Sequence, residues 1–336
     1  DVTLWLAGKN VESAAASGWK GPVVTVVAEG FETGASLRAL STLWTLWRAI
    51  GICTEVMRAN PPAVMLAMGS YASVGPIRAA LRCRVPYVLH ESNVIPGRAM
   101  RWLARRAAAV AGAFEETGYY LKRSDLVMTG MPLRRDLELA AAQTAARPAD
   151  FTLLVMGGSG GARRLNEVVP AAMAALHREG RAPRIIHLTG RVAEGSVRAA
   201  YEQAGVPATV HGFTHDMAGL YRQASFALCR SGAATCAELS AFGIPALLVP
   251  YPHAISDHQT ANARALEKVG AADVVADGDL TAGWLATYLR ERMNQPERLA
   301  RMGQQARSRL QASGAERLAD LLEQIGGRSR GRSAPR

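Results

Sequence analysis

Two strand-to-helix turns in the second half of the chain carry the residues best suited to chemistry. The first turn places small residues, 231–234, before a helix that carries Glu238 about one turn in. The second follows an apolar strand ending at Pro250 and leads to Asp257-His258-Gln259 at the start of the next helix. A helix start offers free N–H groups to a diphosphate, a carboxylate suits ribose hydroxyls, and uncharged hydrogen-bonding side chains suit a sugar. The two turns therefore predict a nucleotide-sugar site in a parallel α/β sheet.

A glycine-rich turn follows another apolar run, at residues 151–156, and leads into a helical pattern. It reads Gly157-Gly158-Ser159-Gly160-Gly161-Ala162, so the backbone could approach a ligand closely and Ser159 could offer a hydroxyl to phosphate. A tight turn without a ligand is the alternative. No Lys-Ser or Lys-Thr pair follows, so this is not a Walker loop. No acid stands where a dinucleotide ribose needs one, which disfavours NAD.

Polar residues also follow strands in the first half of the chain. Gly69-Ser70-Tyr71 comes after one apolar run, and His90-Glu91-Ser92-Asn93 comes after the next. Both groups are expected at the ligand-binding end of a parallel sheet, although helix capping and a buried histidine explain the same residues. Arg134 stands near an expected seam between domains, where it could reach phosphate or simply lie on the surface.

The sequence predicts no metal site and no cofactor. His253 and His258 lack a third ligand at a typical spacing. Asp277-Gly278-Asp279 resembles a metal-binding Asp-x-Asp pair, but its position after a terminal strand favours a surface turn. The four cysteines form no Cys-x-x-Cys pair, so we expect reduced core thiols and a cytoplasmic chain.

Two helical patterns in the first half combine tryptophans with arginines. Trp44, Trp47 and Ile50 lie at spacings of three, close to one face of a helix expected over residues 36–59. Trp102 lies on a second helix and is flanked by arginines. This combination suits a membrane interface, and the core packing of an amphipathic helix is the alternative.

The chain is strongly basic, with a formal net charge of +11. The last ten residues contain four arginines and no acid, so the rest of the chain still carries +7. A positive chain suits nucleic acid, an anionic membrane surface or an anionic substrate, and no zinc-finger or RNP signature favours nucleic acid. Residues 327–336 are expected to be a disordered tail. We recognise no membrane-spanning run and no signal peptide.

Short apolar strands alternate with helices along the chain, which predicts an α/β protein with parallel sheets and helices on both faces. The pattern occurs twice and predicts two doubly wound domains with a cleft between them. The seam is expected within residues 132–150. We expect one helix over residues 99–111 and a last one over 314–325, which either closes the second domain or crosses back to the first.

The combination of motifs resembles the MurG family, the peptidoglycan N-acetylglucosaminyltransferases that convert lipid I to lipid II. The resemblance extends from Val2 to about Ile325. Its six ordered motifs are Gly-x-Tyr at 69–71, His-Glu-x-Asn at 90–93, Gly-x-Pro-x-Arg at 130–134, Gly-Gly-Ser-x-Gly-Ala at 157–162, Ser-Gly-Ala-x-Thr-x-x-Glu at 231–238, and Pro-Tyr-Pro-His…Asp-His-Gln…Asn-Ala at 250–263.

The resemblance implies a GT-B glycosyltransferase, an α/β protein with two doubly wound Rossmann-like domains facing a cleft. Residues 1–133 would form the acceptor and membrane-facing domain, and 134–313 would bind UDP-N-acetylglucosamine, with the final helix returning to the first domain. Within the donor site, Glu238 would take the ribose, and His258 with Gln259 would meet the sugar hydroxyls. The implied donor residues are Asn93, Arg134, Ser159, Thr214, Ala233, Ala234, Thr235, Cys236, Ala237, Glu238, His258 and Gln259. The implied acceptor-side residues are Gly69, Ser70, Tyr71, His90 and Glu91.

The implied reaction is inverting transfer of N-acetylglucosamine to the 4-hydroxyl of undecaprenyl-pyrophosphoryl-N-acetylmuramyl-pentapeptide. The family's first strand, its first glycine-rich loop with a histidine, and the next helix have no counterpart in this sequence. The chain therefore resembles an N-terminally truncated member, expected to bind UDP but transfer little sugar. The favoured base is expected in that loop, and His90 and Glu91 are weaker candidates.

The resemblance also implies a peripheral protein on the cytoplasmic face of the plasma membrane, with an anionic lipid surface and lipid I as partners and no nucleic acid. Two alternatives stay open at this point. One is another GT-B glycolipid glycosyltransferase, and the other is a non-catalytic nucleotide-sugar-binding protein.

Overall fold

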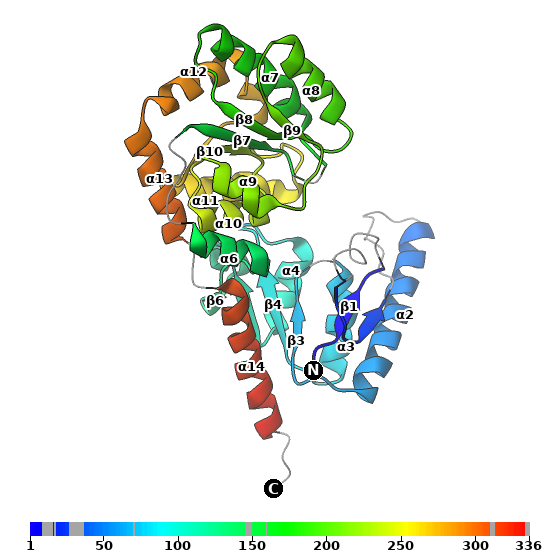
Figure 1. Ribbon diagram of the computed structural model, residues 1–336. Helices are drawn as coiled ribbons and strands as arrows, with labels where there is room; N and C mark the ends of the chain where they lie inside the picture. The colour runs from blue at the N-terminus through cyan, green and yellow to red at the C-terminus, as the bar shows by residue number, and fades with distance from the viewer. Residues whose placement is uncertain are drawn as a thin grey trace. The chain divides into compact units, whose positions relative to one another are not determined.

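The structure is a computed structural model that describes residues 1–8, 16, 18–26, 37–69, 71–144, 150–158, 160–309 and 313–332. The chain divides into two compact units (Figure 1). Unit 1 comprises Asp1–Glu91, Pro96–Met128 and Glu316–Arg336, and unit 2 comprises Ser92–Ile95 and Thr129–Ala315. The sequence placed the boundary after residue 133, whereas the structure places it after Met128 and assigns the short segment Ser92–Ile95 to unit 2.

Unit 2 is built on a six-stranded sheet in which all neighbouring strands are parallel. Its strands are β7 (Thr152–Met156), β8 (Arg184–Leu188), β9 (Thr209–His211), β10 (Phe226–Cys229), β11 (Ala246–Leu248) and β12 (Ala272–Val274). Their order is β12-β11-β10-β7-β8-β9, so the chain reverses its direction of winding between β7 and β10. Ligands of open α/β sheets bind beyond the carboxyl ends of the strands at such a reversal.

Helices cover both faces of this sheet (Figure 1). Strand residues such as Leu153, Val155 and Leu228 are fully buried in the core against one helical layer, as expected for parallel strands. That layer consists of α7 (Arg163–Arg178), α8 (Glu194–Gln203) and α12 (Ala282–Met293). The remaining helices of the unit are α6 (Arg135–Gln143), α9 (Met217–Gln223), α10 (Ala233–Phe242), α11 (His258–Lys268) and α13 (Pro296–Ser308), with short 3-10 turns η3 (Ile255–Asp257) and η4 (Asp277–Asp279).

Unit 1 contains two parallel sheets among its described residues. The larger sheet has the order β3-β4-β5-β6, and the smaller one pairs β1 with β2. The strands are β1 (Leu4–Leu6), β2 (Val23–Thr25), β3 (Met65–Ala67), β4 (Tyr87–Glu91), β5 (Ala109–Gly112) and β6 (Leu126–Met128). The helices are α2 (Leu37–Ala59), η1 (Tyr71–Ser73), α3 (Val74–Arg82), α4 (Arg98–Leu103), η2 (Ala104–Arg106) and α5 (Thr117–Leu121).

The sequence predicted one helix over residues 99–111, and this prediction was wrong for its second half. Helix α4 ends at Leu103, η2 adds one turn, and Ala109–Gly112 form β5. The alanines favour a helix by intrinsic propensity. All four residues of β5 are nevertheless buried between β4 and β6, and this tertiary packing decides the outcome.

Helix α14 (Gly314–Arg332) belongs largely to unit 1. Leu318 and Leu321 pack in one buried cluster with Val88, Ala109 and Ala111, which point from β4 and β5. The helix therefore covers one face of the four-stranded sheet. The expected disordered tail began at residue 327, but α14 continues to Arg332, and residues 333–336 lie outside the described part. None of the described helices is long and apolar enough to cross a membrane.

Candidate functional site

The start of α10 lies directly after β10, at the reversal of the sheet of unit 2. Gly232 is the N-cap residue, and no side chain caps the first turn. The Ser231 hydroxyl instead donates to the backbone oxygen of Gln259 at 2.8 Å. An uncapped helix start of this kind is suited to an anion. Among the residues predicted here, Ala234 is exposed, Ala233, Thr235 and Ala237 are half-buried, and Cys236 has its side chain in the core.

The loop between β11 and α11 is tied to the same place. The backbone N–H of Tyr251 donates to Oε1 of Gln259 at 3.0 Å, and Nδ1 of His258 lies 2.7 Å from the Ile255 oxygen. Ser256 and Asp257 both adopt positive φ, 55° and 53°. Such angles are costly for residues other than glycine and cluster at functional sites. The predicted residues His258 and Gln259 are therefore held on a tightly constrained loop beside the α10 start.

Asn93 reaches this loop through a residue to which the sequence gave no role. Asn262 is fully buried in α11, and its Nδ2 donates to Asn93 Oδ1 at 3.0 Å and to the Ser231 oxygen at 3.2 Å. Its Oδ1 accepts from the backbone N–H of Val94 at 2.9 Å. Asn262 thus fixes the Ser92–Ile95 segment within unit 2.

Glu238 lies one turn into α10 and is half-buried. The Tyr221 hydroxyl of α9 donates to its Oε2 at 2.5 Å. Burial raises the pKa of Glu238, while the Tyr221 hydrogen bond and the charge of Arg134 counteract that shift and Asp136 adds to it. Arg134 forms an ion pair with Asp136 at 3.2 Å. The positive charge of Arg134 therefore acts on the Glu238 carboxyl.

The loops after β7 and β9 complete the carboxyl edge of the sheet. Gly158 and Gly161 have positive φ, 89° and 75°, and Ser159 lies outside the described residues. The Thr214 hydroxyl accepts from the backbone N–H of Asp216 at 3.0 Å. These loops lie at the edge where the predicted donor residues of unit 2 gather.

The predicted acceptor-side residues lie in unit 1. Gly69 has a φ of 75°, Tyr71 is 47% exposed, and Ser70 lies outside the described residues. His90 is fully buried and Glu91 is 7% exposed, both at the end of β4. Their burial means that neither side chain stands open to solvent as a ready proton acceptor.

The tryptophans of the predicted membrane patch are exposed. Trp44 is 62%, Trp47 69% and Trp102 49% exposed, and Arg48 and Arg78 lie over the rings of Trp44 and Trp102 at 5.7 and 5.6 Å. Ile50 does not belong to this patch, because it is only 8% exposed. Six residues along a helix rotate a side chain about 120° away from Trp44, which turns Ile50 inward.

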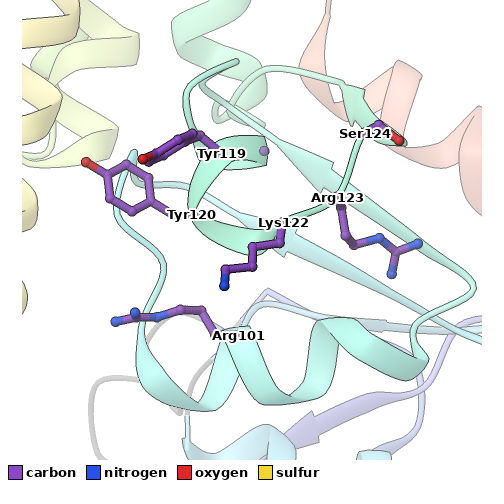
Figure 2. A pocket seen from close by; sticks show the side chains of 7 residues that line it. Arg101, Tyr119, Tyr120, Lys122, Arg123 and Ser124 are labelled. Carbon is purple, nitrogen blue, oxygen red and sulfur yellow. The ribbon is translucent and has the colours of Figure 1, made fainter.

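A hollow in unit 1 was not predicted from the sequence. It has a volume of about 720 Å³ and is lined on one side by Arg101 of α4. Figure 2 shows Arg101 and Lys122 below two tyrosine rings, while Arg123 points to the opposite side. Arg123 is held by Asp125 and by the Ala104 oxygen. The other lining residues are Gly118, Tyr119, Tyr120 and Ser124. No acid is among the lining residues, and Arg101 and Lys122 are its cations besides Arg123, whose charge Asp125 balances.

Asp277–Asp279 form a turn in which Gly278 and Asp279 are exposed, as the sequence predicted, but Asp277 has a further contact that was not predicted. The turn η4 places Asp277 in an ion pair with Arg230 at 2.6 Å, and both side chains are largely buried. Arg230 also donates to the backbone oxygens of Val249 and Pro250, each at 3.1 Å. The pair joins the ends of β10, β11 and β12. No cluster of three or more His, Cys, Asp or Glu side chains suited to a metal occurs in the part of the chain that the structure describes.

Comparison with known families gives a consistent result for both units. Residues 6–112 match the model of the glycosyltransferase family 28 N-terminal domain, and residues 152–322 match the C-terminal domain model. The chain is 41% identical over 293 residues to the UDP-N-acetylglucosamine--N-acetylmuramyl-(pentapeptide) pyrophosphoryl-undecaprenol N-acetylglucosamine transferase of Brucella abortus, covering 85% of this chain and 76% of that protein. It is 43% identical over 292 residues to the transferase of the same description from Bordetella petrii, covering 86% and 76%.

Solved structures agree with these relatives. The crystal structure of Acinetobacter baumannii MurG superimposes with a TM-score of 0.78 at 27% identity, covering 96% of this chain and 90% of that one. The Neisseria meningitidis UDP-GlcNAc 2-epimerase bound to UDP-GlcNAc has a TM-score of 0.65 at 11% identity, covering 96% and 91%. At that identity the second similarity concerns the fold alone.

Proposed function

We infer the function from one premise: this chain belongs to glycosyltransferase family 28, within the MurG family of N-acetylglucosaminyltransferases with the two-domain GT-B fold. We propose that it transfers N-acetylglucosamine from UDP-N-acetylglucosamine to the 4-hydroxyl of the lipid-linked muramyl pentapeptide, which converts lipid I to lipid II in peptidoglycan synthesis.

The observation that carries the proposal is the gathering of donor-type groups at the sheet reversal of unit 2. The uncapped start of α10 suits the diphosphate, Glu238 suits the ribose, and Gln259 with His258 suits the sugar. Ser231 and Asn262 join these elements through hydrogen bonds of 2.8 and 3.2 Å. The site would therefore be organised before the donor binds, which lowers the entropic cost of binding.

In the proposed reaction the acceptor hydroxyl attacks the anomeric carbon of the donor and UDP leaves with inversion. The charge developing on the leaving diphosphate would be stabilised by the α10 start and by Arg134. The proposal thus assigns the neutralising charge to protein groups and not to a metal. A base must accept the hydroxyl proton. His90 and Glu91 remain candidates, and their burial favours a role in shaping the acceptor side of unit 1.

We further propose that unit 1 docks on the cytoplasmic surface of the membrane as a peripheral protein. Its exposed tryptophans Trp44, Trp47 and Trp102 come from α2 and α4, and α3 packs against both of these helices. Arg101 lies next to Trp102 and lines the basic hollow of Figure 2. Aromatic side chains with a basic surround suit an anionic lipid surface.

Donor binding tests the proposed function. Glu238→Ala should weaken UDP-N-acetylglucosamine binding by about 1.5–3 kcal/mol, the scale of a hydrogen bond to a charged group. Isothermal titration calorimetry of the two proteins measures this difference. Glu202→Ala is the matched control, because Glu202 is exposed on α8 of the same unit. Unchanged affinity in Glu238→Ala removes Glu238 from the site, and a wild-type protein that does not bind UDP contradicts the proposed function.

A further inference from the structure

We propose that Tyr221 is a positioning residue of the donor site, whose hydroxyl orients the Glu238 carboxylate toward the ribose and so favours ribonucleotides over 2′-deoxyribonucleotides. This inference rests on the proposed function, because it takes the ligand to be a uridine diphosphate sugar. Because Tyr221 is only 1% exposed, its hydroxyl would act on the ribose through Glu238 and not by direct contact.

Tyr221 contacts one face of α10 at two points. Its hydroxyl donates to Glu238 Oε2 at 2.5 Å, and its ring lies 5.1 Å from the ring of Phe242. Glu238 and Phe242 are four residues apart, so they share a helix face. Tyr221 is only 1% exposed. The ring is therefore fixed by packing, and the hydroxyl in turn fixes the carboxylate.

The helix that carries Tyr221 is anchored to a second part of the predicted site. Asp216 caps α9 by accepting from the Gly219 N–H at 2.7 Å. The backbone N–H of Asp216 donates to the Thr214 hydroxyl at 3.0 Å. A short, capped helix thus connects the Thr214 loop to Glu238. A carboxylate held in this way loses less side-chain entropy when it accepts the ribose hydroxyls.

The protonation states support the same role. Burial raises the pKa of Tyr221 well above its ordinary value, so its hydroxyl keeps its proton and donates at neutral pH. Burial also raises the pKa of Glu238, and the Tyr221 hydrogen bond opposes that shift. Removing the hydroxyl should raise the pKa of Glu238 further, and a protonated Glu238 accepts fewer hydrogen bonds from ribose.

The test compares UDP with 2′-deoxy-UDP as calorimetric probes of the full chain. Tyr221→Phe keeps the ring and removes the hydroxyl. We expect UDP affinity to fall roughly tenfold and 2′-deoxy-UDP affinity only about twofold, because the second ligand lacks a hydroxyl that Glu238 would accept from. The fall in UDP affinity on acidification should begin at higher pH in Tyr221→Phe than in the wild type.

Tyr201→Phe is the matched control. Tyr201 is 2% exposed in the same unit, and its hydroxyl pairs with Nδ1 of His187 at 3.0 Å, not with Glu238. The Tyr201→Phe variant should bind UDP and 2′-deoxy-UDP only slightly more weakly than the wild type, and to the same extent for both ligands. In a Glu238→Gln background, Tyr221→Phe should lower UDP affinity by less than a further twofold, since the effects of two residues that act through one contact are not additive.

Each outcome separates the inference from the proposed function. If the wild type does not bind UDP, the proposed function fails. The inference is overturned if the wild type binds UDP but Tyr221→Phe lowers the affinity for both ligands equally, or leaves the pH dependence of UDP affinity unchanged. Tyr221 would then have a merely structural role. Thermal melting checks the fold, and Tyr221→Met provides a second variant without the hydroxyl if Tyr221→Phe melts far below Tyr201→Phe.

Discussion

Two neighbouring glycines in the turn after β7 face different surroundings. Gly161 has a φ of 75°, and a Cβ there would overlap the carbonyl oxygen of Thr189, whereas nothing lies within 4 Å of a Cβ on Gly160. Gly161→Ala should therefore destabilise the protein by about 2 kcal/mol or more, through strain and overlap together. Gly160→Ala, its matched control, should stay within about 0.5 kcal/mol of the wild type. Urea unfolding measures both, and equal stabilities would contradict the tight turn.

The sequence predicted the residues proposed to contact the ligand, but it did not predict the residues that hold them in place. Glu238 and Gln259 stand at recognisable places, just after the start of a helix that follows a strand. Tyr221 and Asn262 lie inside helices, where a polar residue carries no local signal. Their roles arise when α9 meets α10, and when α11 meets the Ser92–Ile95 segment, across 17 and 168 or more positions of sequence.

A buried histidine connects strand β8 with helices α7 and α8 through hydrogen bonds. His187 of β8 is fully buried, with Nε2 3.1 Å from Asn166 Oδ1 and Nδ1 3.0 Å from the Tyr201 hydroxyl. Asn166 uses its Nδ2 to donate to the Thr189 oxygen at 2.9 Å. Its Oδ1 must therefore accept from His187, which makes Nε2 the protonated nitrogen of a neutral ring whose Nδ1 accepts from Tyr201.

This network predicts how stability depends on pH. Burial lowers the pKa of His187 to about 3, against about 6.5 in the unfolded chain. Because the unfolded state takes up the proton first, the stability contributed by neutral His187 is complete above about pH 6.5 and is lost as the pH falls toward 3. At pH 4.5 the loss is roughly 2–3 kcal/mol. His187→Gln should lower stability at pH 7.5 and flatten this decline.

Urea unfolding at pH 7.5 and 4.5 measures the effect. His177→Gln is the control, because it removes an exposed imidazole from α7 and should leave the wild-type difference between the two pH values intact. A His187→Gln variant with the full wild-type decline would show that other groups cause the acid sensitivity.

At the scale of elements, apolar periodicity predicted most strands, and the α/β fold class is confirmed. The error at β5 has a physical reason. Its sequence Ala-Val-Ala-Gly has no alternation of apolar and polar residues, because helices pack on both of its faces while β4 and β6 flank its edges. A strand of this kind cannot be distinguished from a buried helix by periodicity alone.

At the scale of the whole molecule, the sequence left the place of the last helix open because its apolar face fits any core. The structure shows Leu318 and Leu321 on the sheet of unit 1. Unit 1 thus depends on residues from both ends of the chain. The two proposed binding sites nevertheless lie in different units, the lipid-binding surface in unit 1 and the nucleotide site in unit 2. Variants should therefore impair lipid binding and nucleotide binding independently.

Vesicle binding tests this separation. Trp44→Ser with Trp47→Ser should reduce co-sedimentation with anionic liposomes at least about tenfold, taking about 1.5 kcal/mol for a large apolar side chain removed from water, while UDP affinity stays unchanged. Added salt should weaken binding of the wild type, because arginines contribute. Trp284→Ser, an exposed tryptophan of unit 2, is the control and should sediment like the wild type. Since Trp44 and Trp47 are 62% and 69% exposed, the double variant should remain folded. If it unfolds, these side chains serve the core, and if it still sediments fully, the lipid contact lies elsewhere on unit 1.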